Sequence, residues 1–92
     1  MNVTDEEILS AILSLGQTCG VFAEPAGAAG TAGVKKALEQ GFIERDASVC
    51  SIVTGNGLKD IANGQKAAGQ PMHLPPDLSA FDRALIDKNI QP

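Results

Sequence analysis

The residues best suited to form a binding or catalytic site lie in the string Ser-Ile-Val-Thr-Gly-Asn-Gly-Leu-Lys-Asp, residues 51–60. It overlaps a β-branched and mostly apolar run, residues 48–53, which predicts a strand inside a sheet. Thr54 then places a hydroxyl at the carboxyl edge of that sheet, where open α/β sheets bind ligands. Gly55 and Gly57 let the backbone turn sharply and leave the hydroxyl uncovered. An Asn-Gly hairpin turn is the alternative, but the residues that follow do not alternate as a second strand would.

A second unusual stretch, residues 23–33, reads Ala-Glu-Pro-Ala-Gly-Ala-Ala-Gly-Thr-Ala-Gly. Pro25 is typical of the first turn of a helix, yet each glycine inside a helix costs up to about 1 kcal/mol relative to alanine. Either the smooth helix packs closely against a sheet or another helix, or a flat ligand or a neighbouring backbone comes close. Glu24 is correspondingly either a site residue or a carboxylate that satisfies free N–H groups at the helix start.

Length, charge and cysteine content exclude several classes of protein. The 92 residues suffice for one small domain. A net charge of −4, the lack of a basic stripe and an aromatic content of 3% argue against nucleic-acid binding. No apolar run approaches the ~20 residues of a membrane helix. Cys19 and Cys50 are too far apart in sequence to indicate a zinc cluster or a disulfide framework. We therefore expect a cytoplasmic protein without a metal site.

Three helices are predicted from capping signals and apolar periodicity. Thr4 and Glu7 form the capping-box pattern Thr-x-x-Glu at the start of an amphipathic helix over 4–18. The second helix covers 25–40, and the third covers 77–87.

Short strands are predicted between these helices, over residues 21–23, 48–53 and 72–74, with a turn and a short helix over 58–69. Helices that alternate with short strands are typical of the α/β class. We therefore expect a three-layer-type fragment with short, mostly parallel strands flanked by helices. Residues 1–92 would form a single α/β domain.

Two strings of this sequence closely resemble the threonine synthase family: Val-Thr-Gly-Asn-Gly-Leu-Lys-Asp at 53–60 and Val-Phe-Ala-Glu-Pro-Ala-Gly-Ala-Ala at 21–29. Threonine synthases are pyridoxal-phosphate lyases of the tryptophan-synthase-β superfamily, also called fold type II. The resemblance is to the C-terminal part of these enzymes and includes the helix start at 3–9 and the closing helix at 75–80. Glu-Pro-Ala-Gly-Ala is shared with threonine and serine dehydratases, so the Thr-Gly-Asn-Gly-Leu-Lys-Asp string is what favours the synthases.

The resemblance implies a cofactor-binding role for Thr54, Gly55, Asn56 and Glu24. Thr54 matches the hydroxyl that hydrogen-bonds the pyridine nitrogen of pyridoxal phosphate in this superfamily. Gly55, Asn56 and Gly57 match positions along the edge of the ring, and many relatives carry histidine in place of Asn56. Glu24 matches a glutamate that lies close to the cofactor site.

The same resemblance implies that important parts of the site belong to segments that this chain does not contain. These are the lysine that carries the cofactor and the glycine-rich loop that binds its phosphate. The lysines of this chain lie outside the family's lysine motif: Lys35, Lys36, Lys59, Lys66 and Lys88. We therefore expect no catalytic residue here, no tight binding of pyridoxal phosphate to this chain alone, and no activity by itself.

The implied function is one wall of the pyridoxal-phosphate site of a threonine synthase, which converts O-phosphohomoserine and water to threonine and phosphate. One alternative is a fragment of a related threonine/serine dehydratase or racemase. The other is a free-standing α/β domain that self-associates without catalysis. The expected partner is the rest of a threonine synthase chain or a second copy. Unpaired strand edges and a smooth helix face predict a homo-oligomer with residues 23–33 or 48–53 near its interface.

Overall fold

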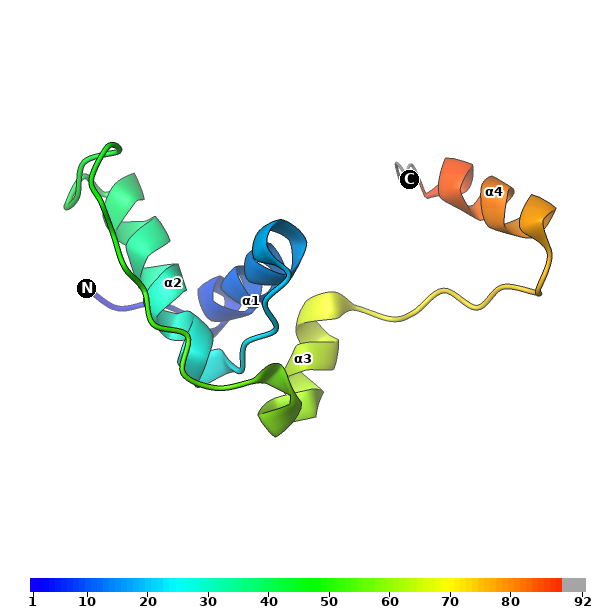
Figure 1. Cartoon of the computed structure of the whole chain (residues 1–92), viewed down its shortest axis with the longest axis horizontal. Coiled ribbons are helices and arrows are strands. Elements are labelled where there is room, and N and C mark those ends of the chain that lie inside the picture. The colour runs from blue at the N-terminus through cyan, green and yellow to red at the C-terminus, as the bar shows by residue number, and fades with distance from the viewer. Residues whose placement is uncertain (89–92) are drawn as a thin grey trace.

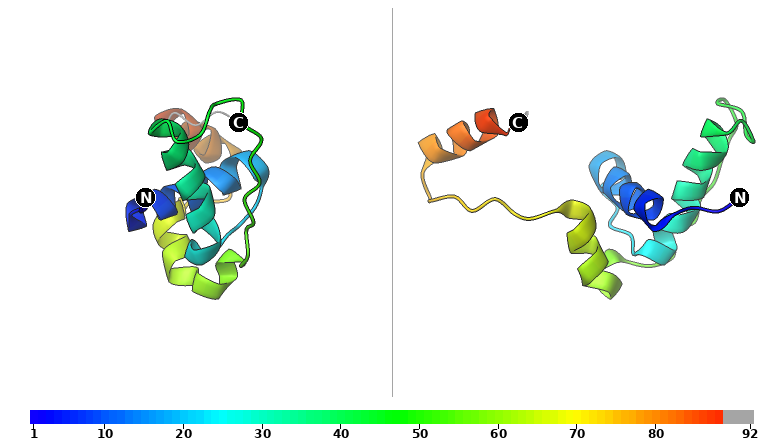
Figure 2. Two further views of the ribbon diagram at one scale, coloured as in Figure 1. Left: turned by 90° about the vertical axis from the view of Figure 1, so that its left-hand side faces the viewer. Right: turned by 180° about the vertical axis from the view of Figure 1, so that it is seen from behind.

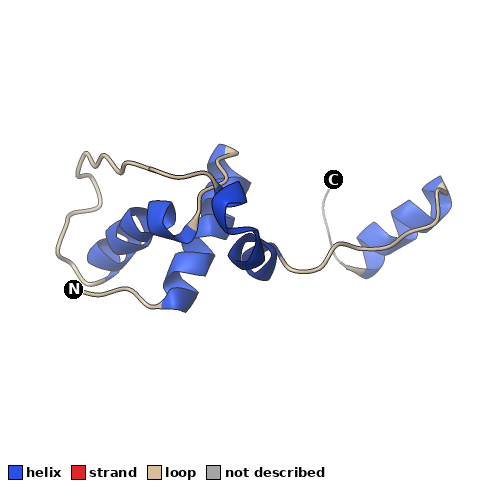
Figure 3. Ribbon diagram, turned by 90° about the horizontal axis from the view of Figure 1, so that it is seen from below, coloured by secondary structure: helices blue, strands red, loops and turns tan. Residues whose placement is uncertain are grey.

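The computed structural model describes residues 1–88, so the last four residues of the domain predicted over 1–92 lie outside the described part. The described chain forms α1 (Asp5–Cys19), α2 (Pro25–Glu39), a short 3-10 helix η1 (Gly57–Asp60), α3 (Ile61–Ala68) and α4 (Leu78–Asp87) (Figure 1). Helix η1 leads directly into α3. Figure 3 shows these helices joined by loops, with no strand in the described part of the chain.

Helix α1 begins where the capping-box pattern places it. The N–H of Thr4 donates to the Glu7 carboxylate at 2.9 Å, and the N–H of Glu7 donates to the Thr4 hydroxyl at 3.1 Å. Two of the free N–H groups at the start of the helix are thereby satisfied. The helix ends at Gly20, whose φ of 67° is accessible to glycine at little cost. The helix predicted over 4–18 is confirmed.

The other helical predictions are also confirmed. Helix α2 begins at Pro25, as expected of proline in a first turn. The region over 58–69, predicted as a turn and a short helix, contains η1 and α3. At the start of α4, the Asp77 carboxylate accepts a hydrogen bond from the N–H of Ser79 at 2.9 Å.

The core forms where α1 packs against α2 on one side and α3 on the other (Figure 2). Its buried members are mostly alanines: Ala11, Ile12, Ala23, Ala28 and Ala32. Around them pack partly buried aliphatic side chains, which are Val3, Ile8, Leu9, Leu15, Val53 and Ala67. Since alanine buries little apolar area, this core provides only a small hydrophobic stabilisation.

Helix α4 lies apart from this core, at the end of an extended segment (Figure 1). None of its own residues is buried, and three of its large apolar side chains are exposed: Leu78, Phe81 and Ile86. The radius of gyration of the chain is 16.3 Å, against about 12 Å for a compact chain of this length. The chain is therefore elongated.

The predicted α/β fold is wrong for the described residues, because none of the strands over 21–23, 48–53 and 72–74 forms. The only pairing there is an isolated antiparallel bridge between Ala23 and Asn56, not the parallel arrangement expected. Residues 48–53 instead run extended alongside α2 (Figure 1). An extended segment becomes a strand only when a neighbouring strand accepts and donates its main-chain hydrogen bonds, and local sequence does not supply that neighbour.

Two further features concern the described residues alone. No helix among them is both long and apolar enough to pass through a membrane. They also contain no cluster of three or more histidine, cysteine, aspartate or glutamate side chains arranged to hold a metal ion.

Candidate functional site

The turn over residues 54–57 is anchored to the start of α2 by two main-chain hydrogen bonds. The N–H of Glu24 donates to the carbonyl oxygen of Gly55 at 3.0 Å, and the N–H of Gly57 donates to that of Phe22 at 2.9 Å. The two strings singled out in the sequence therefore meet in space, although more than twenty residues separate them.

The Glu24 side chain lies directly against Gly55. A Cβ atom built on Gly55 would overlap the Glu24 carboxyl group, and Cγ of Glu24 would be only 2.8 Å away. Glu24 is half-buried and stands at the N-cap position of α2, yet its side chain accepts no capping hydrogen bond. The helix-capping interpretation of Glu24 is therefore wrong, and its carboxylate instead packs against the 54–57 turn.

The glycines of α2 allow a neighbouring backbone to come close. A Cβ atom on Gly27 would lie 3.1 Å from the nitrogen and 3.2 Å from the oxygen of Gly55. A Cβ atom on Gly30 would lie 3.2 Å from the Ser51 hydroxyl, whereas one on Gly33 would have no neighbouring atom within 4 Å. Close approach of the 54–57 turn thus accounts for Gly27, the glycine nearest the helix start.

The polar side chains of the turn have different surroundings. Asn56 accepts a hydrogen bond from the N–H of Leu58 at 2.9 Å, so its amide oxygen caps η1. The Thr54 side chain is exposed. The four residues predicted to bind the cofactor, Thr54, Gly55, Asn56 and Glu24, therefore lie together at one turn. They offer a neutral hydroxyl, a carboxylate and main-chain groups, which suit binding better than nucleophilic catalysis.

Sequence reasoning missed Phe22, which packs against this turn from the other side. Its ring occupies the space that a Cβ atom would need on Gly57, and it lies close to the same position on Gly64. Both glycines are buried. No helical periodicity in the sequence links these two glycines, because Asp60 between them has a non-helical backbone with φ −140° and ψ 74°.

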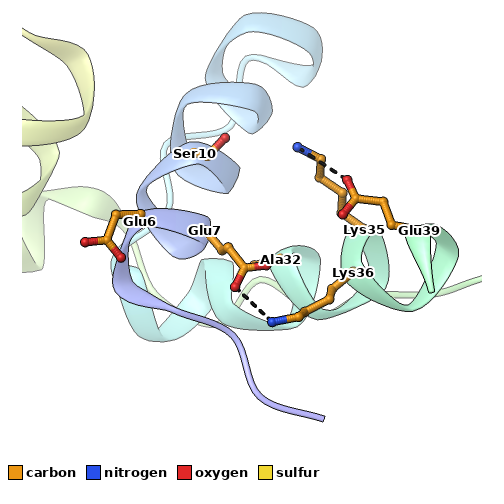
Figure 4. A pocket seen from close by; sticks show the side chains of 7 residues that line it. All are labelled: Glu6, Glu7, Ser10, Ala32, Lys35, Lys36 and Glu39. Atoms are coloured by element: carbon orange, nitrogen blue, oxygen red, sulfur yellow. Dashed lines mark hydrogen bonds and ion pairs between the residues drawn. The ribbon is translucent and has the colours of Figure 1, made fainter.

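A separate hollow of about 230 Å³ lies between α1 and α2 (Figure 4). Four of its charged side chains form two pairs. The Lys36 ammonium donates to the Glu7 carboxylate at 3.0 Å, and Lys35 lies 3.9 Å from Glu39. The Glu7–Lys36 pair joins the start of α1 to the last turn of α2, so these groups serve the packing of the two helices.

Glu7 makes the stability of the chain depend on pH. Two hydrogen bonds lower the pKa of this carboxyl below its ordinary value of 4.5. The larger effect comes from the N–H of Thr4 and the next from the Lys36 ammonium. A carboxyl group whose pKa is lower in the folded state than in the unfolded state stabilises the fold fully at pH values above its unfolded-state pKa. This stabilisation is lost as the pH falls through the folded-state pKa. Glu7→Gln should therefore lower the urea midpoint at pH 7, and the difference from the unmodified chain should shrink below pH 4.5.

The matched control is Glu6→Gln, because Glu6 is the exposed neighbour and lies in the same first turn of α1. It should change the midpoint less than Glu7→Gln does at pH 7. A Glu7→Gln difference that stays constant from pH 7 to pH 3 would contradict this account.

Comparison with known proteins identifies the family. The model of the family described as "Pyridoxal-phosphate dependent enzyme" matches residues 1–55. The chain belongs to this family. It is 43% identical over 83 residues to the threonine synthase of Methanocaldococcus jannaschii, a match that covers 90% of this chain and 20% of that protein.

Two further relatives agree. The chain is 46% identical over 80 residues to the threonine synthase of Halalkalibacterium halodurans, covering 86% of this chain and 23% of that enzyme. It is 38% identical over 87 residues to that of Methanosarcina acetivorans, covering 95% of this chain and 22% of the enzyme. The resemblance to threonine synthases is confirmed, and the chain spans about a fifth of the length of these relatives.

The residues of the 54–57 turn fit the cofactor of this family. Thr54 is exposed, and its hydroxyl is a neutral group able to donate to an aromatic ring nitrogen. Gly55 and Gly57 add no side chains of their own to the turn. The two main-chain hydrogen bonds and the Glu24 side chain hold the turn in place.

Proposed function

We propose that this chain forms one wall of the pyridoxal-phosphate site of a threonine synthase. In this proposal the Thr54 hydroxyl donates a hydrogen bond to the pyridine nitrogen, and the main chain of residues 54–56 lies along the edge of the ring. The observation that carries the proposal is the anchored 54–57 turn, which keeps the Thr54 side chain exposed while Glu24 packs behind Gly55.

Each residue of the turn has a distinct part in this proposal. A neutral hydroxyl at Thr54 leaves the pyridine nitrogen less protonated than a carboxylate would. Glu24 and Gly55 together set the position of the main chain, and Asn56 fixes the start of η1. When bound, the cofactor supplies the electron sink for the conversion of O-phosphohomoserine and water to threonine and phosphate.

The rest of the site would come from the remainder of a threonine synthase chain or from a second copy of this chain, which we propose as its partner. Exposed apolar side chains on both sides of the turn support such a partner. Ile52 is 77% exposed before the turn, and Leu58 is 68% exposed after it. Burial of these two side chains against a partner would be favourable, because it removes apolar surface from water.

A chimera tests the proposed function directly. This chain would replace the 83 matching residues of the M. jannaschii enzyme, to which it is 43% identical. The folded chimera should bind pyridoxal phosphate and release phosphate from O-phosphohomoserine. A chimera that folds, shown by a native-like melting transition, but binds no pyridoxal phosphate would contradict the proposal.

The chain alone should not carry the cofactor covalently at one position. After incubation with pyridoxal phosphate and reduction with borohydride, mass spectrometry should find only substoichiometric adducts scattered over its lysines. The physical reason is that a specific adduct needs one lysine held beside a formed cofactor pocket. The unmodified M. jannaschii enzyme serves as the positive control. One stoichiometric adduct at a single lysine of the isolated chain would contradict this expectation.

A further inference from the structure

We propose that Phe22 is a positioning residue for the cofactor site, acting through the 54–57 turn. Its ring would set the distance between that turn and α3, and thereby the orientation of the Thr54 hydroxyl. This inference rests on the proposed function, because it assigns a role at the same site.

Phe22 holds the turn through both its main chain and its side chain. Its carbonyl oxygen accepts a hydrogen bond from the N–H of Gly57 at 2.9 Å. Its ring covers the face of Gly57 where any other residue would carry a Cβ atom, and a Cβ atom on Gly64 would lie 2.9 Å from Cζ of the ring. One side chain is therefore seated against the first residue of η1 and against the middle of α3.

The surroundings of the ring distinguish it from an ordinary core residue. Phe22 is 43% exposed and lies outside the buried cluster of α1, α2 and α3. It also lines an apolar groove between α1 and α3, together with Ile12 and Leu13. A smaller side chain would leave η1 free to move toward residues 22–24, and the 54–57 turn would move with it.

The test uses the chimera described above, with cofactor affinity as the main readout. Phe22→Leu should weaken pyridoxal-phosphate binding by roughly 10- to 100-fold, the effect expected when a displaced Thr54 hydroxyl leaves the pyridine nitrogen without its hydrogen bond. The affinity is measured by titrating the cofactor-free chimera with pyridoxal phosphate and following its absorbance. The wavelength of the absorbance maximum should shift as well, since the environment of the pyridine nitrogen changes.

A compensating variant and a matched control separate positioning from general stability. Gly64→Ala combined with Phe22→Leu places a methyl group where the ring was, and should restore affinity to within about threefold of the unmodified chimera. Leu15→Val also removes apolar volume, but at a side chain that packs against the core and does not line the groove beside Phe22. It should lower the urea midpoint without changing the affinity.

The outcomes separate this inference from the proposed function. Unchanged affinity in Phe22→Leu, an equal loss in Leu15→Val, or no rescue by Gly64→Ala would each overturn the positioning role. If Thr54→Val weakens binding while Phe22→Leu does not, only this inference fails. If neither variant changes affinity, the assignment of the site to the 54–57 turn fails too.

Discussion

Thr54→Val should weaken pyridoxal-phosphate binding to the chimera by about 5- to 150-fold. Valine keeps the shape of threonine but removes the hydroxyl, so a buried pyridine nitrogen would lose its partner. An unsatisfied buried polar group costs about 1–3 kcal/mol, which corresponds to that range of affinities. The measurement is a titration of the cofactor-free protein with pyridoxal phosphate.

Thr54→Ser is the matched control, because it keeps the hydroxyl and removes only a methyl group. It should bind the cofactor nearly as well as the unmodified chimera. Equal affinity, spectrum and turnover in Thr54→Val and the unmodified chimera would refute the role of this hydroxyl.

Ala28→Asp should destabilise the chain by about 3–5 kcal/mol, the cost of an uncompensated buried charge. Ala28 has 0% exposure and lies in the core between the helices. Small domains are stable by only about 5–15 kcal/mol in total, so this substitution would remove a large part of the free energy of unfolding. The measurement is urea unfolding followed by circular dichroism at pH 7.

The control for this variant is Ala26→Asp, two residues earlier in the same helix. Ala26 is exposed and lies in the first turn of α2, where a negative charge is favoured by the helix dipole. It should leave the urea midpoint unchanged or raise it slightly. Similar losses of stability in both variants would contradict the packing of α2 described above.

The helices could be predicted because their signals are local. Thr4 and Glu7 are three residues apart and cap each other within one turn. Pro25 fits the first turn of α2 without any long-range contact. Such signals act between residues that are neighbours in sequence, so a single sequence contains them in full.

The strands could not be predicted in the same way. The β-branched run over 48–53 indicates an extended backbone, and Figure 1 shows this segment running alongside α2 without helical turns. A strand also needs a neighbour for its main-chain hydrogen bonds, which depends on residues far away in sequence or in another chain. The prediction of an α/β fold assumed that such neighbours were present.

The candidate site was predicted only in part. The glycines at Gly55 and Gly57 marked the turn, and the resemblance to threonine synthases joined it to Glu24. Nothing local indicated that the Glu24 carboxylate packs against Gly55 instead of capping α2. Phe22 was missed because its contacts reach two glycines more than thirty residues away in the sequence.

A crystal structure of the chimera with pyridoxal phosphate tests the central claim most directly. The quantity to measure is the distance between the Thr54 hydroxyl oxygen and the pyridine nitrogen of the cofactor. The account predicts a hydrogen bond of about 2.7–3.2 Å between these two atoms, with the main chain of residues 54–56 along the ring edge. A cofactor whose pyridine nitrogen faces another residue, with the Thr54 hydroxyl beyond hydrogen-bonding distance, would contradict it.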